Sequence, residues 1–252
     1  MGTDNKFGEV SEGFPRYLEN ENLNKIVKDL VHKAEKEIIP SRIFYTLADG
    51  SENFPPLSTI PHRSFIDDLQ IIYHIKTAEA DDKKFGSYIV RSEDAEYLNL
   101  KEEDLFKIAS QNTNKLFRPI TRTIQDVWVR DYMEQGYSSW EATEKAYKKF
   151  ESSPSAYICS SYGSPYGTAL LLDKNFLDGM AGKLGGDYYV LFNSTDSFAV
   201  IRKEDYTNTF FVEIDSSLAA NAPDDKIRLS DKMYLYSKKE GKLLTHIFPQ
   251  AS

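Results

Sequence analysis

The segment from Ala156 to Lys203 limits the possible folds most, because it carries strand and helix signals in close succession. Apolar runs rich in β-branched and aromatic residues predict four short strands, at 156–160, 168–172, 188–192 and 198–202. Between the second and third runs, apolar residues recur at helical spacing. We predict a helix here that is capped by Asp173 and closed by Gly185. The segment therefore predicts a compact mixed unit, and it contains no motif typical of an active site.

The residues before this segment are predicted to be mainly helical. Apolar residues at three- and four-residue spacing predict an amphipathic helix over 23–34, packed against another element through its apolar face. Acidic residues followed by an apolar stripe predict a helix over 101–116. Residues 121–150 predict two more helices divided by a glycine, and Ser138 with Glu141 forms a capping box where the second begins.

Strand signals interrupt this helical part of the chain. β-Branched and aromatic residues predict a strand at 43–47. Alternating side chains over 69–75 predict a hairpin that returns at 88–90. The tip of that hairpin is acidic and contains Asp81 and Asp82, which are therefore expected to be solvated.

Together these elements predict an α+β fold with mixed, mostly antiparallel sheets and packed helices, in one domain or two subdomains. The polar residues 1–20 carry no pattern and are expected to form a loose arm. Residues 21–153 then form a helix, hairpin and helix region, and residues 154–252, with a last strand at 233–237, form a mixed α/β sheet region. A boundary is expected at Pro154, which ends a short polar linker.

Charge and composition exclude several classes of protein. The chain has 31 basic and 39 acidic residues, a net charge of −8, and the basic residues are scattered rather than gathered into a stripe for phosphates. It has one cysteine, no signal-like start and no long apolar run. We therefore expect a cytoplasmic protein without disulfides or a cofactor, which binds neither nucleic acid nor a membrane.

Several sequence blocks resemble an uncharacterised bacterial family, a domain of unknown function from anaerobic gut bacteria that is often found among genes of mobile elements. These blocks are residues 60–65, 105–113, 166–172, 184–191 and 229–236. The resemblance implies a family and a fold, and it carries over no catalytic residues. The chain departs from the family pattern before Tyr17 and in the less regular stretch 208–223.

The densest polar group consists of His62, Arg63, Asp67 and Asp68. A histidine beside carboxylates is typical of a general base or a metal ligand. A proline precedes the group and an alternating strand follows it, which favours a structural role in which Arg63 pairs with a neighbouring acid. Asp67 and Asp68 are adjacent, so on a strand their side chains would diverge.

Other candidates for chemistry have simpler explanations. The four histidines are dispersed and cannot form a zinc site with a single cysteine. Cys159 lies in a predicted strand, where burial would leave its thiol inert. The glycines at 163–167 and 185–186 are explained by turns, since neither set has the pattern of a phosphate-binding loop.

The chain has 16 tyrosines, more than a core needs, because a buried hydroxyl requires a partner. Tyr162 and Tyr166 flank a turn and are expected to be exposed, as anchors for protein recognition or as covers of the sheet ends. Together with Asp81 and Asp82 at the acidic hairpin tip, they are the residues that we predict to bind a protein partner. We therefore predict a non-catalytic protein–protein interaction module, an inhibitor or modulator in conflict between hosts and mobile elements such as phage defence. The alternatives are a metal-dependent hydrolase built around His62, Asp67 and Asp68, and a small-molecule or nucleotide-binding protein.

Overall fold

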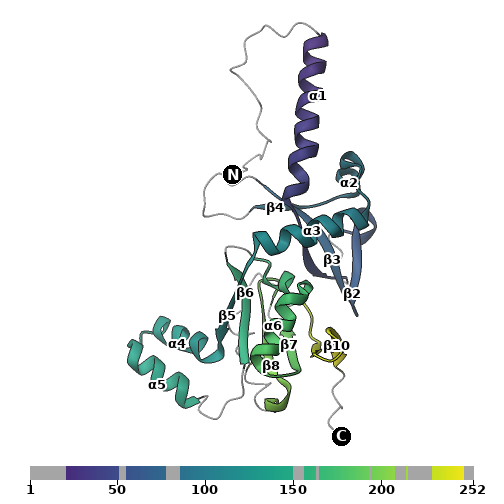
Figure 1. Ribbon diagram of the computed structural model, residues 1–252. Coiled ribbons are helices and arrows are strands. Elements are labelled where there is room, and N and C mark those ends of the chain that lie inside the picture. The colour runs from purple at the N-terminus through teal and green to yellow at the C-terminus, as the bar shows by residue number, and fades with distance from the viewer. Residues whose placement is uncertain are drawn as a thin grey trace. The chain divides into compact units, whose positions relative to one another are not determined.

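The computed structural model in Figure 1 describes residues 21–50, 55–77, 86–149, 156–162, 165–192, 194–207, 214 and 229–246. The chain divides into two units, Met1–Ser41 and Arg42–Ser252. Helix α1 (Glu21–Ile38) belongs to the first unit and is followed by the 3₁₀ turn η1 (Ile39–Arg42). Its helical periodicity is as predicted. The expected burial is wrong at Leu30 and Ala34, both of which are exposed.

The second unit begins with an antiparallel sheet built around β3 (Leu69–Lys76). One edge of β3 pairs with β1 (Ile43–Asp49) along its whole length, and the other edge pairs with two shorter strands, β2 (His62–Ile66) and β4 (Ser87–Ile89). The predicted pairing of the strand at 69–75 with the strand at 88–90 is therefore confirmed.

Two helices follow this sheet, α2 (Ser92–Leu98) and α3 (Glu102–Leu116). Helix α3 begins with three acidic residues in its first turn, as predicted, and it buries one apolar stripe against β1. Two of its polar side chains also bind β1. The Thr113 hydroxyl accepts from the Tyr45 amide at 3.2 Å, and Asn112 donates to the Ile43 carbonyl at 2.8 Å.

The second sheet has six strands and only antiparallel pairs within the described residues. Their order is β10 (Lys242–His246), β9 (Met233–Ser237), β7 (Tyr188–Phe192), β8 (Ser197–Arg202), β6 (Ala156–Tyr162) and β5 (Arg118–Thr123). All five residues of β7 are buried, so this strand lies at the centre of the core. The fold is α+β, as the sequence predicts.

Helix α6 (Lys174–Leu184) connects the two halves of this sheet and has the predicted ends. The Asp173 side chain accepts from the Asn175 amide at 2.9 Å, and Gly185 has a left-handed φ of 82°. The residues before α6 differ from the prediction. They form the 3₁₀ helix η3 (Gly167–Leu172) in place of a strand, because β5 and β8 already occupy both edges of β6.

Helices α4 (Ile124–Glu134) and α5 (Ser139–Lys149) form a hairpin that extends away from the β5 side of the second sheet (Figure 1). Ile124 and Trp128 attach α4 to the sheet core. The predicted capping box is present, since the Glu141 amide donates to the Ser138 hydroxyl and the Ser138 amide donates to Glu141. The prediction of helix at 121–123 is wrong, because these residues complete β5.

Strand β10 was not predicted from the sequence. Gly241 has a φ of 64° in the turn that joins β9 to β10. The boundary expected at Pro154 stays a prediction; strands β5 and β6, on either side of that position, pair with each other.

Candidate functional site

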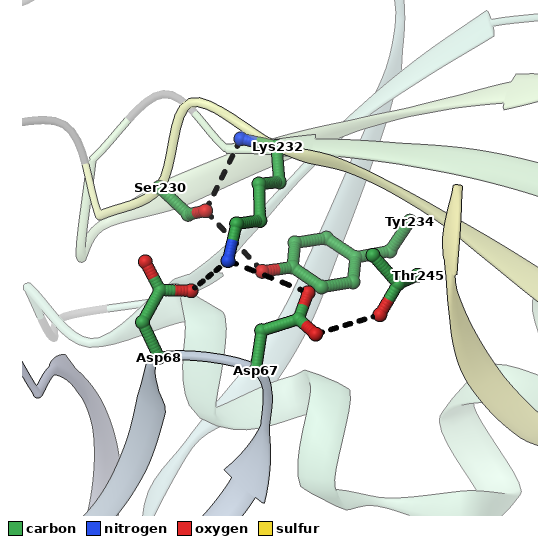
Figure 2. Close-up of polar contacts among 6 residues, drawn as sticks. All are labelled: Asp67, Asp68, Ser230, Lys232, Tyr234 and Thr245. Carbon is green, nitrogen blue, oxygen red and sulfur yellow. Dashed lines mark hydrogen bonds and ion pairs between the residues drawn. The ribbon is translucent and has the colours of Figure 1, made fainter. Parts of the chain in front are cut away.

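The tip of the β2–β3 hairpin carries two of the predicted site residues, Asp67 and Asp68. Figure 2 shows Lys232, which precedes β9, reaching toward both carboxylates. Its Nζ lies 3.0 Å from Asp68 Oδ1 and 3.7 Å from Asp67 Oδ2. The Thr245 hydroxyl of β10 donates to Asp67 Oδ1 at 2.8 Å. The hairpin tip of the first sheet is therefore tied to two neighbouring strands of the second sheet.

The hydroxyl groups of two further residues lie beside this ion pair (Figure 2). The Ser230 and Tyr234 hydroxyls are 3.2 Å apart, and the Lys232 amide donates to Ser230 Oγ at 3.2 Å. Burial raises the pKa of Tyr234, and the hydrogen bond to Asp68 raises the pKa of Lys232. Both groups therefore stay protonated at neutral pH. The cluster is a connector between the two sheets, because Lys232 and Thr245 both bind carboxylates of the β2–β3 tip.

The backbone conformation of Asp67, at the tip of the β2–β3 hairpin, can be tested separately from its carboxylate. Its φ of 50° lies in the left-handed region, which aspartate tolerates and alanine does not. Asp67→Gly should remove the carboxylate without backbone strain, and Asp67→Ala should remove it with strain. We expect Asp67→Ala to be less stable than Asp67→Gly by about 1 kcal/mol in urea unfolding. Equal stabilities would show that the turn relaxes out of this conformation.

Arg63 has the acidic partner that the sequence predicts, and the partner is Glu102 in the first turn of α3. The guanidinium donates twice to this carboxylate, at 3.0 and 2.7 Å, and lies 4.2 Å from the centre of the Phe106 ring. The Tyr73 hydroxyl donates to the same carboxylate. The two hydrogen bonds to Glu102 and the stacking on Phe106 hold α3 on the sheet. Arg63 therefore has a structural role.

His62 lies on β2, with its ring Nδ1 3.0 Å from the Ile60 carbonyl. Arg63 binds Glu102, whereas Asp67 and Asp68 bind Lys232. Among the residues that the structure describes, no three histidine, cysteine or acidic side chains are grouped as a metal ion requires. His62, Asp67 and Asp68 therefore do not form the site on which the hydrolase alternative depends.

His74 on β3 is buried between aromatic rings. Its ring stacks on Phe44 at 5.3 Å and lies 5.0 Å from Tyr166, and its Nε2 is 3.1 Å from the Thr46 hydroxyl. Burial lowers the pKa of His74 to about 4, so the ring is neutral at physiological pH. A buried neutral histidine of this kind is a core residue.

The structure separates the two tyrosines that were expected to be exposed together. Tyr162 ends β6 and is 73% exposed, as predicted. The prediction for Tyr166 is wrong. Its ring packs on Phe44 as well as His74, and its hydroxyl lies 3.1 Å from that of Ser87, because η3 turns it toward the first sheet. Asp81 and Asp82 lie outside the described residues.

Cys159 is buried on β6, as the sequence predicts. Burial raises the pKa of its thiol to about 12, which keeps it protonated. The thiolate is the reactive form of cysteine, so this position is chemically inert at neutral pH.

An open depression of about 490 Å³ lies beside the turn that follows α6. It is lined by Gly185, Gly186, Asp187, Arg202, Lys203 and Glu204. Its two basic side chains already have acidic partners: Arg202 lies 2.5 Å from Asp205, and Lys203 lies 3.7 Å from Asp187. The lining therefore shows internal charge pairing rather than the convergent polar groups typical of a nucleotide site.

The α4–α5 hairpin carries a surface that the sequence analysis did not predict. Four large apolar side chains are exposed there and are called the aromatic surface below: Met133 (47%), Tyr137 (38%), Trp140 (72%) and Tyr147 (53%). On α5 the opposite face is fully buried through Ala142 and Ala146. The available signal was the seven-residue spacing of Trp140 and Tyr147, which places both on the face opposite the alanines.

Contacts within the hairpin position Tyr137, one of the four residues of this surface. Lys145 Nζ lies 4.2 Å from the centre of the Tyr137 ring and 5.5 Å from that of Tyr132. The Tyr132 and Tyr137 rings meet edge to face at 5.8 Å, and the Tyr132 ring lies 5.7 Å from that of Trp128. A continuous row of rings therefore runs from the sheet core to the turn between the helices, which holds α5 in position on α4.

The fold and these contacts define an α+β protein with two antiparallel sheets. Residues 4–238 match the family of unknown function DUF5688, and the chain belongs to that family. No curated protein and no solved structure matches it. Within the described part of the chain, no helix combines the length and apolar character that crossing a membrane requires.

Proposed function

We propose that this chain is a non-catalytic protein–protein interaction module and that the aromatic surface of the α4–α5 hairpin binds its partner. The observation that carries the proposal is Trp140, which is 72% exposed on a helix that already buries its alanine face. Tryptophan, tyrosine and methionine are enriched at protein interfaces.

The polar side chains described above support this proposal, because they bind one another within the chain. The acids at the β2–β3 tip bind Lys232, Glu102 binds Arg63, and His74 is buried and neutral. Each arrangement contributes to the packing of sheets or helices. The aromatic surface is different, since its exposed side chains contribute little to the core of this chain.

A more specific form of the proposal is an inhibitor or modulator in conflict between bacterial hosts and mobile elements. It rests on the resemblance to a family expected among genes of mobile elements. A protein of this kind acts by occupying a surface of its target, for which rigid aromatic anchors on a projecting hairpin are suited.

The proposal is tested by capture from a bacterial lysate with the full chain carrying a photocrosslinking residue at position 143, an exposed position next to Trp140 on the helix surface that leaves the tryptophan in place. We expect Trp140→Ala to weaken binding of the identified partner by about thirtyfold, since a central interface tryptophan contributes 2 kcal/mol or more. Tyr97→Ala is the matched control, because Tyr97 is 40% exposed on α2 and lies outside the aromatic surface. Its affinity should stay within about twofold of the parent chain.

Two results would contradict the proposal. One is the absence of any protein crosslinked specifically through position 143. The other is a partner whose affinity changes equally in Trp140→Ala and Tyr97→Ala, which would place the binding surface elsewhere.

A further inference from the structure

We infer that the Tyr166 side chain is an acid-sensitive gate, which covers His74 at neutral pH and swings into solvent when His74 is protonated. Tyr166 directly precedes η3, and His74 lies on β3 of the first sheet. The inference goes beyond the proposed function and does not depend on it, because neither residue lies on the α4–α5 hairpin.

The surroundings of the His74 ring suit the neutral form alone. The ring packs against the rings of Phe44 and Tyr166, with centres 5.3 and 5.0 Å away. Its Nε2 lies 3.1 Å from the Thr46 hydroxyl, whereas its Nδ1 is buried and has no hydrogen-bond partner among the described residues. A protonated imidazole donates from both nitrogens. Protonation in this arrangement would therefore bury an N–H group without an acceptor, which costs free energy.

No carboxylate compensates for this cost within the part of the chain that the structure describes. Burial is the cause that lowers the pKa of His74. The other titratable side chains on this face of the first sheet are Lys76 on β3 and His62 on β2, and η3 adds Tyr166. The strands on either side of His74 present uncharged side chains, which are Phe44 and Thr46 from β1 and Ser87 and Ile89 from β4.

Tyr166 is the part of this enclosure that is free to rotate. Phe44 is fully buried on β1, which pairs with β3 along its whole length. Tyr166 lies outside the strands and is partly exposed, and its hydroxyl lies 3.1 Å from that of Ser87, which is also partly exposed. Rotation of the Tyr166 side chain admits water to His74 without breaking a strand pair.

The backbone beside Tyr166 stays in place during this rotation. At Gly167 a Cβ would lie 1.9 Å from the carbonyl oxygen of Asp196, so the two backbone segments are in close contact. The Thr168 amide and hydroxyl both donate to the Thr195 carbonyl, at 3.1 and 2.9 Å. These contacts hold η3 on the second sheet, so the opening is a movement of one side chain.

Acid favours the open gate, because a solvated histidine binds a proton more tightly than an enclosed one. The pKa of the enclosed His74 is about 4, and that of a solvated histidine is about 6.5. The ratio of open to closed chain therefore rises as the pH falls between these values, by up to about three-hundredfold. At neutral pH both forms are unprotonated and the gate stays closed. We expect it to open at about pH 4 to 5.

The test follows both side chains by NMR in the purified full chain, with a fluorinated tyrosine at position 166 and isotope-labelled histidine. His74→Gln identifies the signals of His74. We expect the fluorine signal and the His74 signals to change with one midpoint, while circular dichroism shows that the helices and strands are retained. In His74→Gln the fluorine signal should not respond over this range of pH.

Two substitutions test the cover itself. Tyr166→Ala removes the ring and should move the titration midpoint of His74 toward pH 6.5, the value of an unperturbed histidine. Tyr166→Phe keeps the ring and removes the hydrogen bond to Ser87, so opening should become about fivefold easier and the midpoint should rise by a smaller amount. Tyr162→Ala is the matched control, because Tyr162 is 73% exposed at the end of β6. It should leave the midpoint unchanged.

Three results would overturn the inference. The fluorine signal could stay constant while His74 titrates, Tyr166→Ala could leave the midpoint of His74 where the parent chain has it, or the whole chain could unfold before Tyr166 responds. Each result would make Tyr166 a fixed core residue. None of them bears on capture of a partner through the α4–α5 hairpin, so the two proposals fail separately.

Discussion

Gly167→Ala is expected to destabilise the protein by about 3 kcal/mol or more. A Cβ at this position would lie 1.9 Å from the carbonyl oxygen of Asp196 and 2.9 Å from the Cα of Ser160. Both neighbours are backbone atoms, so no side chain can turn aside to make room. Gly167 is buried at the start of η3, where the Thr168 amide donates to the Thr195 carbonyl at 3.1 Å. Urea unfolding followed by circular dichroism measures the change.

A second glycine provides a control, at which the same substitution is expected to stabilise the protein. Gly182 lies on the exposed side of α6, and a Cβ there would have no atom within 4 Å. Gly182→Ala should therefore stabilise the protein by about 0.5 to 1 kcal/mol, because alanine loses less backbone entropy in a helix. If Gly167→Ala also stabilised the protein, the close approach of Gly167 to the backbone of Asp196 and Ser160 would be refuted.

Acid is expected to destabilise the protein through His74. The pKa of this ring is about 4 in the folded chain, against about 6.5 for an unperturbed histidine. Between these values the unfolded chain binds the proton and the folded chain does not, so stability falls as pH falls. The expected loss from this one group between pH 6.5 and 4 is about 3 kcal/mol. Urea unfolding at half-unit pH steps measures this slope.

Two variants separate the titration of His74 from its packing. His74→Gln keeps a polar group near Thr46 but does not titrate, so stability should depend less on pH over this window. Thr46→Val removes the hydroxyl that contacts His74 Nε2 and should lower stability while the pH dependence persists. If His74→Gln showed the slope of the parent chain, the acid sensitivity would belong to other groups.

Elements whose signals are local were predictable from the sequence. The capping box of Ser138 and Glu141, the cap at Asp173 and the left-handed Gly185 each involve residues a few positions apart. Alternation over 69–75 likewise reflects the two faces of a single strand. These patterns are set by local sterics and hydrogen bonds, which is why the helix ends and most strands agree with the structure.

Elements that depend on distant partners were not predictable in this way. Residues 121–123 directly precede a helix and were predicted to be helical. They form the end of β5 instead, because they pair with the edge of β6. Residues 168–172 have the composition of a strand, yet both edges of β6 are taken and they form η3. In each case the availability of a pairing edge decided the structure.

The same division applies to the candidate site. From the sequence alone, Arg63 was expected to pair with an acid and Cys159 to be a buried strand residue, because both follow from strand position. Tyr162 was expected to be exposed because it lies beside a turn. Only the tertiary structure showed that Lys232 joins Asp67 and Asp68, and that α5 leaves Trp140 in solvent. Local periodicity assigns a side chain to a face of its own helix or strand. What covers that face depends on segments far away in the chain, and those contacts form only when the whole chain packs.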